Sequence, residues 1–127
     1  MDKLTGLHQL TFGTFFIQTL GNGLDRLVNL QQLTFGYDFN HVLDNSLDKL
    51  TSLEQLTFGD DFNNGEKLLG TSLDNLTKLQ QLTFGDNFNQ PFNNSLDKLV
   101  NLQKLTISIN YSHLLPHKYN LKIETIL

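Results

Sequence analysis

The four-residue sequence LTFG occurs four times in this chain, and its spacing constrains the fold more than any other feature. Its leucine stands at Leu10, Leu33, Leu56 and Leu82, and the last of these intervals is slightly longer than the two before it. Leu105, one further period along the chain, opens a fifth and altered copy. Repeats of about 20–29 residues with regularly spaced leucines are typical of solenoids, in which one chain winds into stacked coils.

Apolar side chains recur at six positions of each repeat, and these positions predict a shared interior. One repeat cannot bury its apolar face alone, so stacked neighbours must supply the rest of the core. The columns expected to face inward are Leu27/Leu50/Leu76/Leu99, Leu30/Leu53/Leu79/Leu102, Leu33/Leu56/Leu82/Leu105, Phe35/Phe58/Phe84 with Ile107, Phe39/Phe62/Phe88 with Tyr111, and Leu43/Phe92/Leu115, and the first unit adds Leu4, Leu7, Leu10, Phe12, Phe16 and Leu20.

Each repeat contains a strand signal followed by a glycine. In Gln55–Phe58, Leu and Phe alternate with polar residues, which is the two-residue period of a β-strand. Successive coils run in one direction, so we expect a parallel sheet with strands about 4.8 Å apart, a spacing at which phenylalanines of neighbouring coils can stack. Gly36, Gly59 and Gly85 are expected to end the strands where the chain bends.

A Ser-Leu-Asp triplet precedes three of the strands and predicts a short helical turn. Serine is a favoured helix N-cap, and an aspartate in the first turn suits the positive end of the helix dipole. The triplets begin at Ser46, Ser72 and Ser95. The sequence therefore predicts an α/β solenoid, a stack of about five 23-residue coils with a parallel β-sheet on the concave face and short helical turns or loops opposite.

The repeat also resembles a known family over nearly the whole chain up to about Ser112. Its L-x-x-L-x-x-L-x-F pattern is similar to leucine-rich repeats, and Phe88–Phe92 (FNQPF) resembles the FNIP repeats, leucine-rich-repeat relatives known from slime moulds and giant DNA viruses. The Phe-Asn pair recurs at Phe39-Asn40, Phe62-Asn63 and Phe88-Asn89, whereas the first unit has Phe16-Ile17 and the last has Tyr111-Ser112.

This resemblance implies a leucine-rich-repeat-like fold and a non-catalytic protein–protein interaction module, acting as a scaffold or adaptor. It also implies the cytoplasm as the location, which would be the host cytoplasm if the protein is viral. Because FNIP repeats are sometimes attached to an F-box, the resemblance further implies an alternative role as the substrate-recognition part of a ubiquitin-ligase adaptor. A structural or vestigial repeat array is the other alternative.

The repeat spacing predicts how the chain is divided. The array should cover residues 1–112, in units of about 1–23, 24–46, 47–72, 73–95 and 96–112, and residues 113–127 should form an irregular C-terminal capping segment. Met1 lies one period before Leu24, so we expect a first coil without a cap. Since solenoids need polar caps, such a coil predicts end-to-end self-association or membership of a longer array.

Composition argues against several function classes. The 127 residues carry a net charge of −4 with scattered Lys and Arg, which does not suit a nucleic-acid surface. The lack of cysteine excludes disulfides and thiolate metal sites, and no segment is long and apolar enough to cross a bilayer. We therefore expect a soluble protein without a nucleic-acid or membrane partner.

No motif points to a cofactor, a metal or catalysis. His113 and His117 are four residues apart, but Pro116 would break a helix that carried both. The acids Asp38, Asp60-Asp61 and Asp86 follow the strand ends without calcium-loop spacing, and we expect them to bond the backbone of their own turns. The column Asn40, Asn63, Asn89 should likewise satisfy the backbone where each coil turns.

The outward side of the sheet is the strongest candidate for binding another protein. Its Thr column is expected to be structural, whereas the column after the glycines varies through Thr14, Tyr37, Asp60, Asp86 and Ile109. Solenoids commonly bind partners on such extended faces, although a solvated polar face is the simpler interpretation. The candidate contact residues are Gln32, Tyr37, Gln55, Asp60, Gln81 and Asp86.

The third unit is three residues longer than the others, and the extra length falls within residues 64–70. Insertions in repeats map to loops on one face, which are often functional. We expect one of Leu68 and Leu69 to fill the inward column and the other to be exposed. Both are therefore included as candidate partner contacts.

Overall fold

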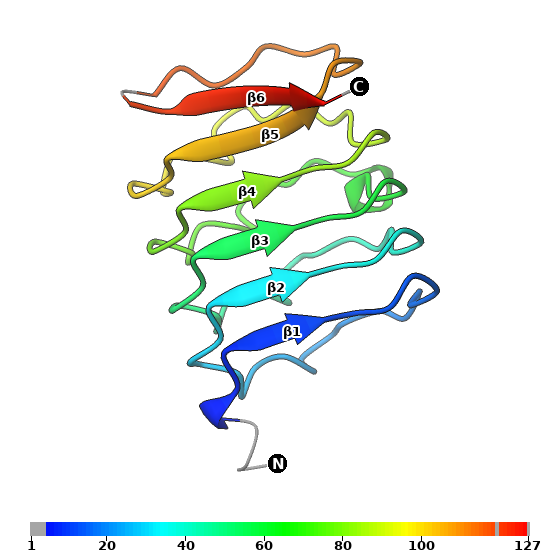
Figure 1. The fold of residues 1–127 in the computed structure, drawn as a ribbon, viewed down its shortest axis with the longest axis vertical. Helices are drawn as coiled ribbons and strands as arrows, with labels where there is room; N and C mark the ends of the chain where they lie inside the picture. The colour runs from blue at the N-terminus through cyan, green and yellow to red at the C-terminus, as the bar shows by residue number, and fades with distance from the viewer. Residues whose placement is uncertain (1–4, 119, 127) are drawn as a thin grey trace.

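One parallel sheet runs the length of the molecule. The computed structural model describes residues 5–118 and 120–126. Figure 1 shows the strands stacked in chain order, with the remainder of each coil behind them. Every neighbouring pair is parallel. The strands are β1 (Gln9–Thr11), β2 (Gln32–Thr34), β3 (Gln55–Thr57), β4 (Gln81–Thr83), β5 (Lys104–Ser108) and β6 (Lys122–Ile126).

The register of the sheet confirms the solenoid. Leu33 pairs with Leu10 on one side and with Leu56 on the other, so equivalent residues of successive repeats lie beside each other. Between β1 and β5 the described chain makes about four complete coils, one fewer than expected. The connection from β5 to β6 is shorter than a full repeat, since Lys104 pairs with Lys122. The segment predicted to be irregular thus contains a strand that extends the sheet.

Of the short helical turns or loops predicted opposite the sheet, the described residues show turns and loops with almost no helix. The chain instead makes successive three-residue turns, in which Leu50 N–H donates to the Leu47 carbonyl at 3.0 Å and Leu53 N–H to the Leu50 carbonyl at 3.1 Å. Leucines spaced by three residues fit a turn of about 3.0 residues better than an α-helix of about 3.6. All three leucines are therefore buried together.

Stacked phenylalanines fill the interior behind the ends of the strands. The ring centroids of Phe35 and Phe58 are 5.3 Å apart with planes 2° from parallel, and those of Phe58 and Phe84 are 5.4 Å apart at 9°. A second stack places Phe39 and Phe62 6.0 Å apart. These rings are at most 2% exposed, so the predicted inward columns are confirmed here.

At the two ends of the array, the burial of the predicted core residues differs from the prediction. Leu115 was expected to face inward but is 41% exposed, because the shortened last connection leaves the repeat period before it. In the first unit Leu10 and Phe12 are only partly buried against the core, as are Leu7, Phe16 and Leu20. Leu4 and Met1 lie outside the described residues.

A column of left-handed residues marks a bend in each coil, and the sequence prediction did not include it. Gly21, Asp44, Gly70 and Asn93 share one repeat position, with φ of 52°, 46°, 56° and 49°. Glycine, asparagine and aspartate tolerate this conformation best. The next residue of the column is Pro116, whose ring excludes a positive φ. The fifth coil therefore cannot make the same bend, which explains why the period ends there.

The glycines that follow the strands are required by close contact between coils rather than by a left-handed backbone. A Cβ on Gly59 would lie 2.3 Å from the Gly36 carbonyl oxygen, and one on Gly36 would lie 2.3 Å from that of Gly13. The backbones of neighbouring coils are in contact at this position. Any side chain would force the coils apart.

This contact predicts that the same substitution, glycine to alanine in the LTFG motif, destabilises the protein at Gly59 and leaves its stability almost unchanged at Gly13. Gly59→Ala should lower the free energy of unfolding by about 1–3 kcal/mol, since the added methyl overpacks fixed backbone. Gly13→Ala is the matched control, because a Cβ there has nothing within 4 Å, and we expect a change within about 0.5 kcal/mol. Urea unfolding followed by circular dichroism measures both, and equal stability of the two variants would contradict the explanation.

Candidate protein-binding site

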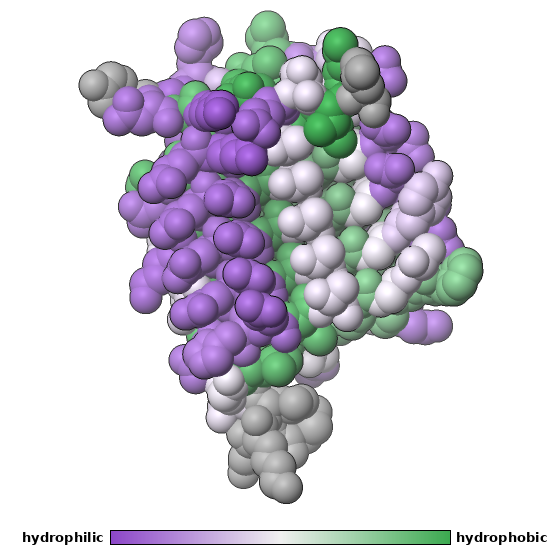
Figure 2. Space-filling view, viewed as in Figure 1, coloured by the Kyte–Doolittle hydropathy of each residue, from purple (hydrophilic) through white to green (hydrophobic). Residues whose placement is uncertain are grey.

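The outward face of the sheet is polar and regular. Inward leucines alternate with outward Gln and Thr, so Gln55 lies in register between Gln32 and Gln81. Gln32 and Gln55 are half-buried, and Gln81 is exposed. Figure 2 views this face and shows hydrophilic side chains gathered over the beginnings of the strands, beside a paler column that follows the stack. A partner could therefore lie flat across several coils.

The variable column borders this face. Tyr37 is 50% exposed and Ile109 is 58% exposed. Asp86 is exposed and Asp60 is half-buried. An Asp60 Oδ1 oxygen accepts a hydrogen bond from Asp86 N–H at 3.3 Å. Asp60 thus bridges two coils instead of bonding its own turn as expected, and it combines a structural contact with partial exposure.

The predicted role of the asparagine column is confirmed. Asn40 Oδ1 accepts Asn63 N–H at 2.7 Å and Gly65 N–H at 3.0 Å. Asn63 Oδ1 in turn accepts Asn89 N–H at 2.8 Å, and Asn89 Oδ1 accepts Ser112 N–H at 2.9 Å. Each amide therefore satisfies a backbone donor of the following coil, which accounts for the Phe-Asn pair of the repeat.

Two of the four histidines have structural contacts of the same kind. His41 Nε2 bonds the Ile17 carbonyl, and His113 Nε2 bonds the Asn89 carbonyl at 2.9 Å. The His41 ring also packs edge-on against Phe39 at 5.8 Å. No group of three or more His, Asp or Glu side chains suited to a metal ion occurs in residues 5–118 and 120–126.

Tyr111 ends the second aromatic stack with a polar group. Its ring lies 6.1 Å from that of Phe88, and its hydroxyl donates to the Gln90 carbonyl at 2.9 Å. Burial raises the pKa of Tyr111 to about 12, against a smaller opposing effect of a hydrogen bond from the Phe92 backbone. The hydroxyl therefore remains a hydrogen-bond donor at neutral pH.

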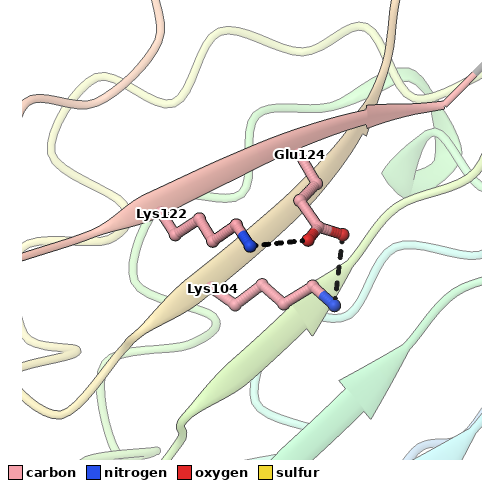
Figure 3. Close-up of polar contacts among 3 residues, drawn as sticks. All are labelled: Lys104, Lys122 and Glu124. Carbon is pink, nitrogen blue, oxygen red and sulfur yellow. Dashed lines mark ion pairs between the residues drawn. The ribbon is translucent and has the colours of Figure 1, made fainter.

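Lysines replace glutamine at the last two strands, and Glu124 replaces threonine at the last one. Figure 3 shows Glu124 of β6 between Lys104 of β5 and Lys122 of its own strand, with oxygen-to-nitrogen distances of 3.2 and 3.3 Å. Hydrogen bonds and charge attraction from both lysines lower the pKa of Glu124. All three side chains are solvent-accessible, so the face ends in a compact charged group that a partner could also reach.

The insertion separates its two leucines as predicted. Leu69 is 1% exposed and fills the core, whereas Leu68 is 53% exposed. The loop around the 3₁₀ helix η2 (Asn64–Glu66) is held by Asn64, whose buried side chain accepts Leu43 N–H at 2.8 Å and donates to the Leu68 carbonyl at 2.9 Å. Only Leu68 of the pair can meet a partner, and it does not belong to the sheet face.

Of the eight candidate contact residues, the structure brings six together on and beside the sheet, namely Gln32, Tyr37, Gln55, Asp60, Gln81 and Asp86. Among the residues described, none lies in a helix that could span a membrane. No family model, no curated protein and no solved structure matches this chain.

The asparagine contacts predict that removing one side-chain acceptor destabilises the protein, and that a substitution which keeps the oxygen does not. Asn40→Ala removes the acceptor of two backbone N–H groups and should lower the free energy of unfolding by about 1–3 kcal/mol. Asn40→Asp keeps an oxygen at the same place and should restore most of that loss. Urea unfolding tests both, and an alanine variant as stable as the wild type would show that water replaces the amide at no cost.

Proposed function

We propose that this protein is a non-catalytic protein-interaction module that binds another protein on the outward face of its sheet. The observation that carries the proposal is the contrast between columns. Thr and Gln repeat almost unchanged along β1 to β4, while the adjoining column changes through Tyr37, Asp60 and Asp86. A uniform scaffold with one variable, accessible column is suited to selecting a partner.

The chemistry of this column also supports the proposal. Tyrosine is enriched in binding hot spots because its ring offers a large contact area and its hydroxyl a hydrogen bond. The two aspartates add negative charge that would select against an acidic partner. The stacked Phe-Asn pairs and the leucine columns agree with a relationship to FNIP repeats, which we propose as the family of this chain.

The binding proposal predicts the outcome of affinity capture with purified protein as bait. A triple variant, Tyr37→Ala with Asp60→Ala and Asp86→Ala, should weaken capture of the wild-type partner by at least about tenfold, as loss of a hot spot does. The matched control, Val28→Ala with Asp48→Ala and Glu54→Ala, removes the same charge away from this column and should retain the partner. If only the control variant failed to capture the partner, the partner would bind on a surface other than the variable column.

A second proposal concerns association between copies of this chain. Phe15 is 83% exposed and Ile17 is 55% exposed in the first coil, although the other units carry polar residues at these positions. β1 and β6 are the edges of the sheet and run in the same direction. We propose that β6 of one copy pairs with β1 of the next, a head-to-tail contact that continues the parallel stack.

This second proposal predicts a concentration-dependent increase in mass by sedimentation velocity. Phe15→Ser with Ile17→Ser should shift the protein toward the monomer, because the contact would lose its apolar area. Val100→Ser is the control, since Val100 is 74% exposed in another coil. A wild-type protein that stays monomeric at high concentration would exclude the contact.

A further inference from the structure

A second accessible stripe runs along the solenoid away from the strands. In three successive coils, the residue just before the inward Leu43, Leu69 or Phe92 is apolar. These residues form one column, Val42, Leu68 and Pro91, and Leu114 follows one period later. Leu68 is 53% exposed and Leu114 is 92% exposed. Apolar side chains that line up on one surface are a marker of interaction sites.

Three grooves lie along this stripe. Val42 lines a groove between the first two coils, Leu68 lines one of about 380 Å³ between the third and fourth, and Pro91 and Leu114 line one of about 390 Å³ near the C-terminal end. Volumes of this size hold small ligands or single side chains. The apolar residues of the stripe therefore lie at the rims of successive grooves, which are separated by one or two coils.

The left-handed residues keep the grooves open. Gly70 lies in the groove beside Leu68, and a Cβ built on it would meet nothing within 4 Å. Gly21 has the same surroundings in the first groove. Asp44 and Asn93, at the same repeat position, show that residues with a side chain can adopt this backbone. The groove is therefore open at Gly70 because glycine has no side chain, not because the backbone there excludes other residues.

The charge of the grooves indicates what they could hold. Asp25 and Asp44 line the first groove, and Asp74 and Asp97 line the one beside Leu68, together with the cation Lys98. The C-terminal groove is lined by His113 and His117 and, among the described residues, by no acid, so the acidic character belongs to the first two grooves. We propose that this side of the solenoid binds an extended peptide segment of another protein in which basic and apolar residues alternate. Apolar side chains would cover the stripe, and basic ones would pair with the aspartates.

The dimensions agree with a short segment. From Val42 to Leu114 the stripe crosses three coil spacings of about 4.8 Å, or about 14 Å, which an extended chain covers with about five residues at about 3.3 Å each. Arginine fits best, because its methylene stem can lie on a leucine while its guanidinium forms paired bonds with a carboxylate. This surface is separate from the sheet face, and neither proposal depends on the other.

Fluorescence anisotropy with labelled octapeptides tests the inference on the full chain. The probe alternates Leu and Arg, and two comparison peptides alternate Leu with Glu and Ser with Arg. We expect the Leu-Arg peptide to bind at least about tenfold more tightly than either comparison peptide, since only it offers both charge and apolar area. Circular dichroism of each variant checks that it is folded.

Three variants locate the site. Leu68→Ser removes the apolar rim and Asp74→Asn with Asp97→Asn removes the charge. Gly70→Asn fills the groove with the residue that adopts the same left-handed backbone at Asn93. Each should weaken binding of the Leu-Arg peptide by about fivefold or more, a change of about 1 kcal/mol. Asp48→Asn with Glu54→Gln alters the net charge equally away from the grooves and the variable column and should change the affinity less than about twofold.

Several results would overturn the inference. Equal weakening by the Asp48 and Glu54 pair would show general attraction to an acidic protein. Full binding by both the Leu68 and Gly70 variants would show that the groove is not used. Absence of binding to the wild type, or equal binding of the Leu-Glu peptide, would exclude a basic apolar segment as the occupant.

Discussion

The distance between neighbouring coils is the constraint on which the rest of the structure depends. A parallel ladder sets strands about 4.8 Å apart, so every residue has its counterpart from the previous repeat as a neighbour. At Gly59 this leaves no room for even a methyl group beside Gly36. At Phe58 it allows near-parallel rings that bury each other. The repetition of LTFG follows from this geometry, because a residue that suits one coil suits the next.

The same constraint absorbs much of the polar chemistry of the chain. Asn40, Asn63 and Asn89 serve backbone donors of the following coil, and His41 and His113 bond carbonyls of the preceding one. Side chains committed to such contacts are poorly placed to act on a ligand. The proposals therefore rest on surfaces that remain accessible, namely the outer sheet surface, the exposed Phe15 and Ile17 of the first coil and the grooved stripe near Leu68, and each concerns binding of another protein or of another copy of this chain.

The sequence predicted features that follow directly from periodicity. The inward columns of the central coils, the parallel register and the division between Leu68 and Leu69 depend only on spacing and polarity, and the structure confirms them, whereas Leu115 at the end of the array is exposed. Of the predicted short helical turns or loops, the structure has turns and loops with almost no helix, because leucines spaced by three residues suit successive three-residue turns better than an α-helix. The bend at Gly21, Asp44, Gly70 and Asn93 could have been read from a column of residues that tolerate positive φ. The binding role of the sheet face is a matter of partner chemistry, which a single chain does not contain.

The direction of the asparagine contacts has a consequence for how the molecule is made. In the column Asn40, Asn63 and Asn89, each side-chain acceptor lies on the earlier coil and each backbone donor on the later one, whereas Asn64 accepts in the opposite direction, from Leu43 N–H. N-terminal segments emerge first from the ribosome, so a newly synthesised coil follows one that already carries the side-chain oxygen that accepts its backbone N–H. From the second coil onward, the acceptor of each contact in this column is therefore synthesised before its donor, so each later coil can add to an acceptor that is already in place.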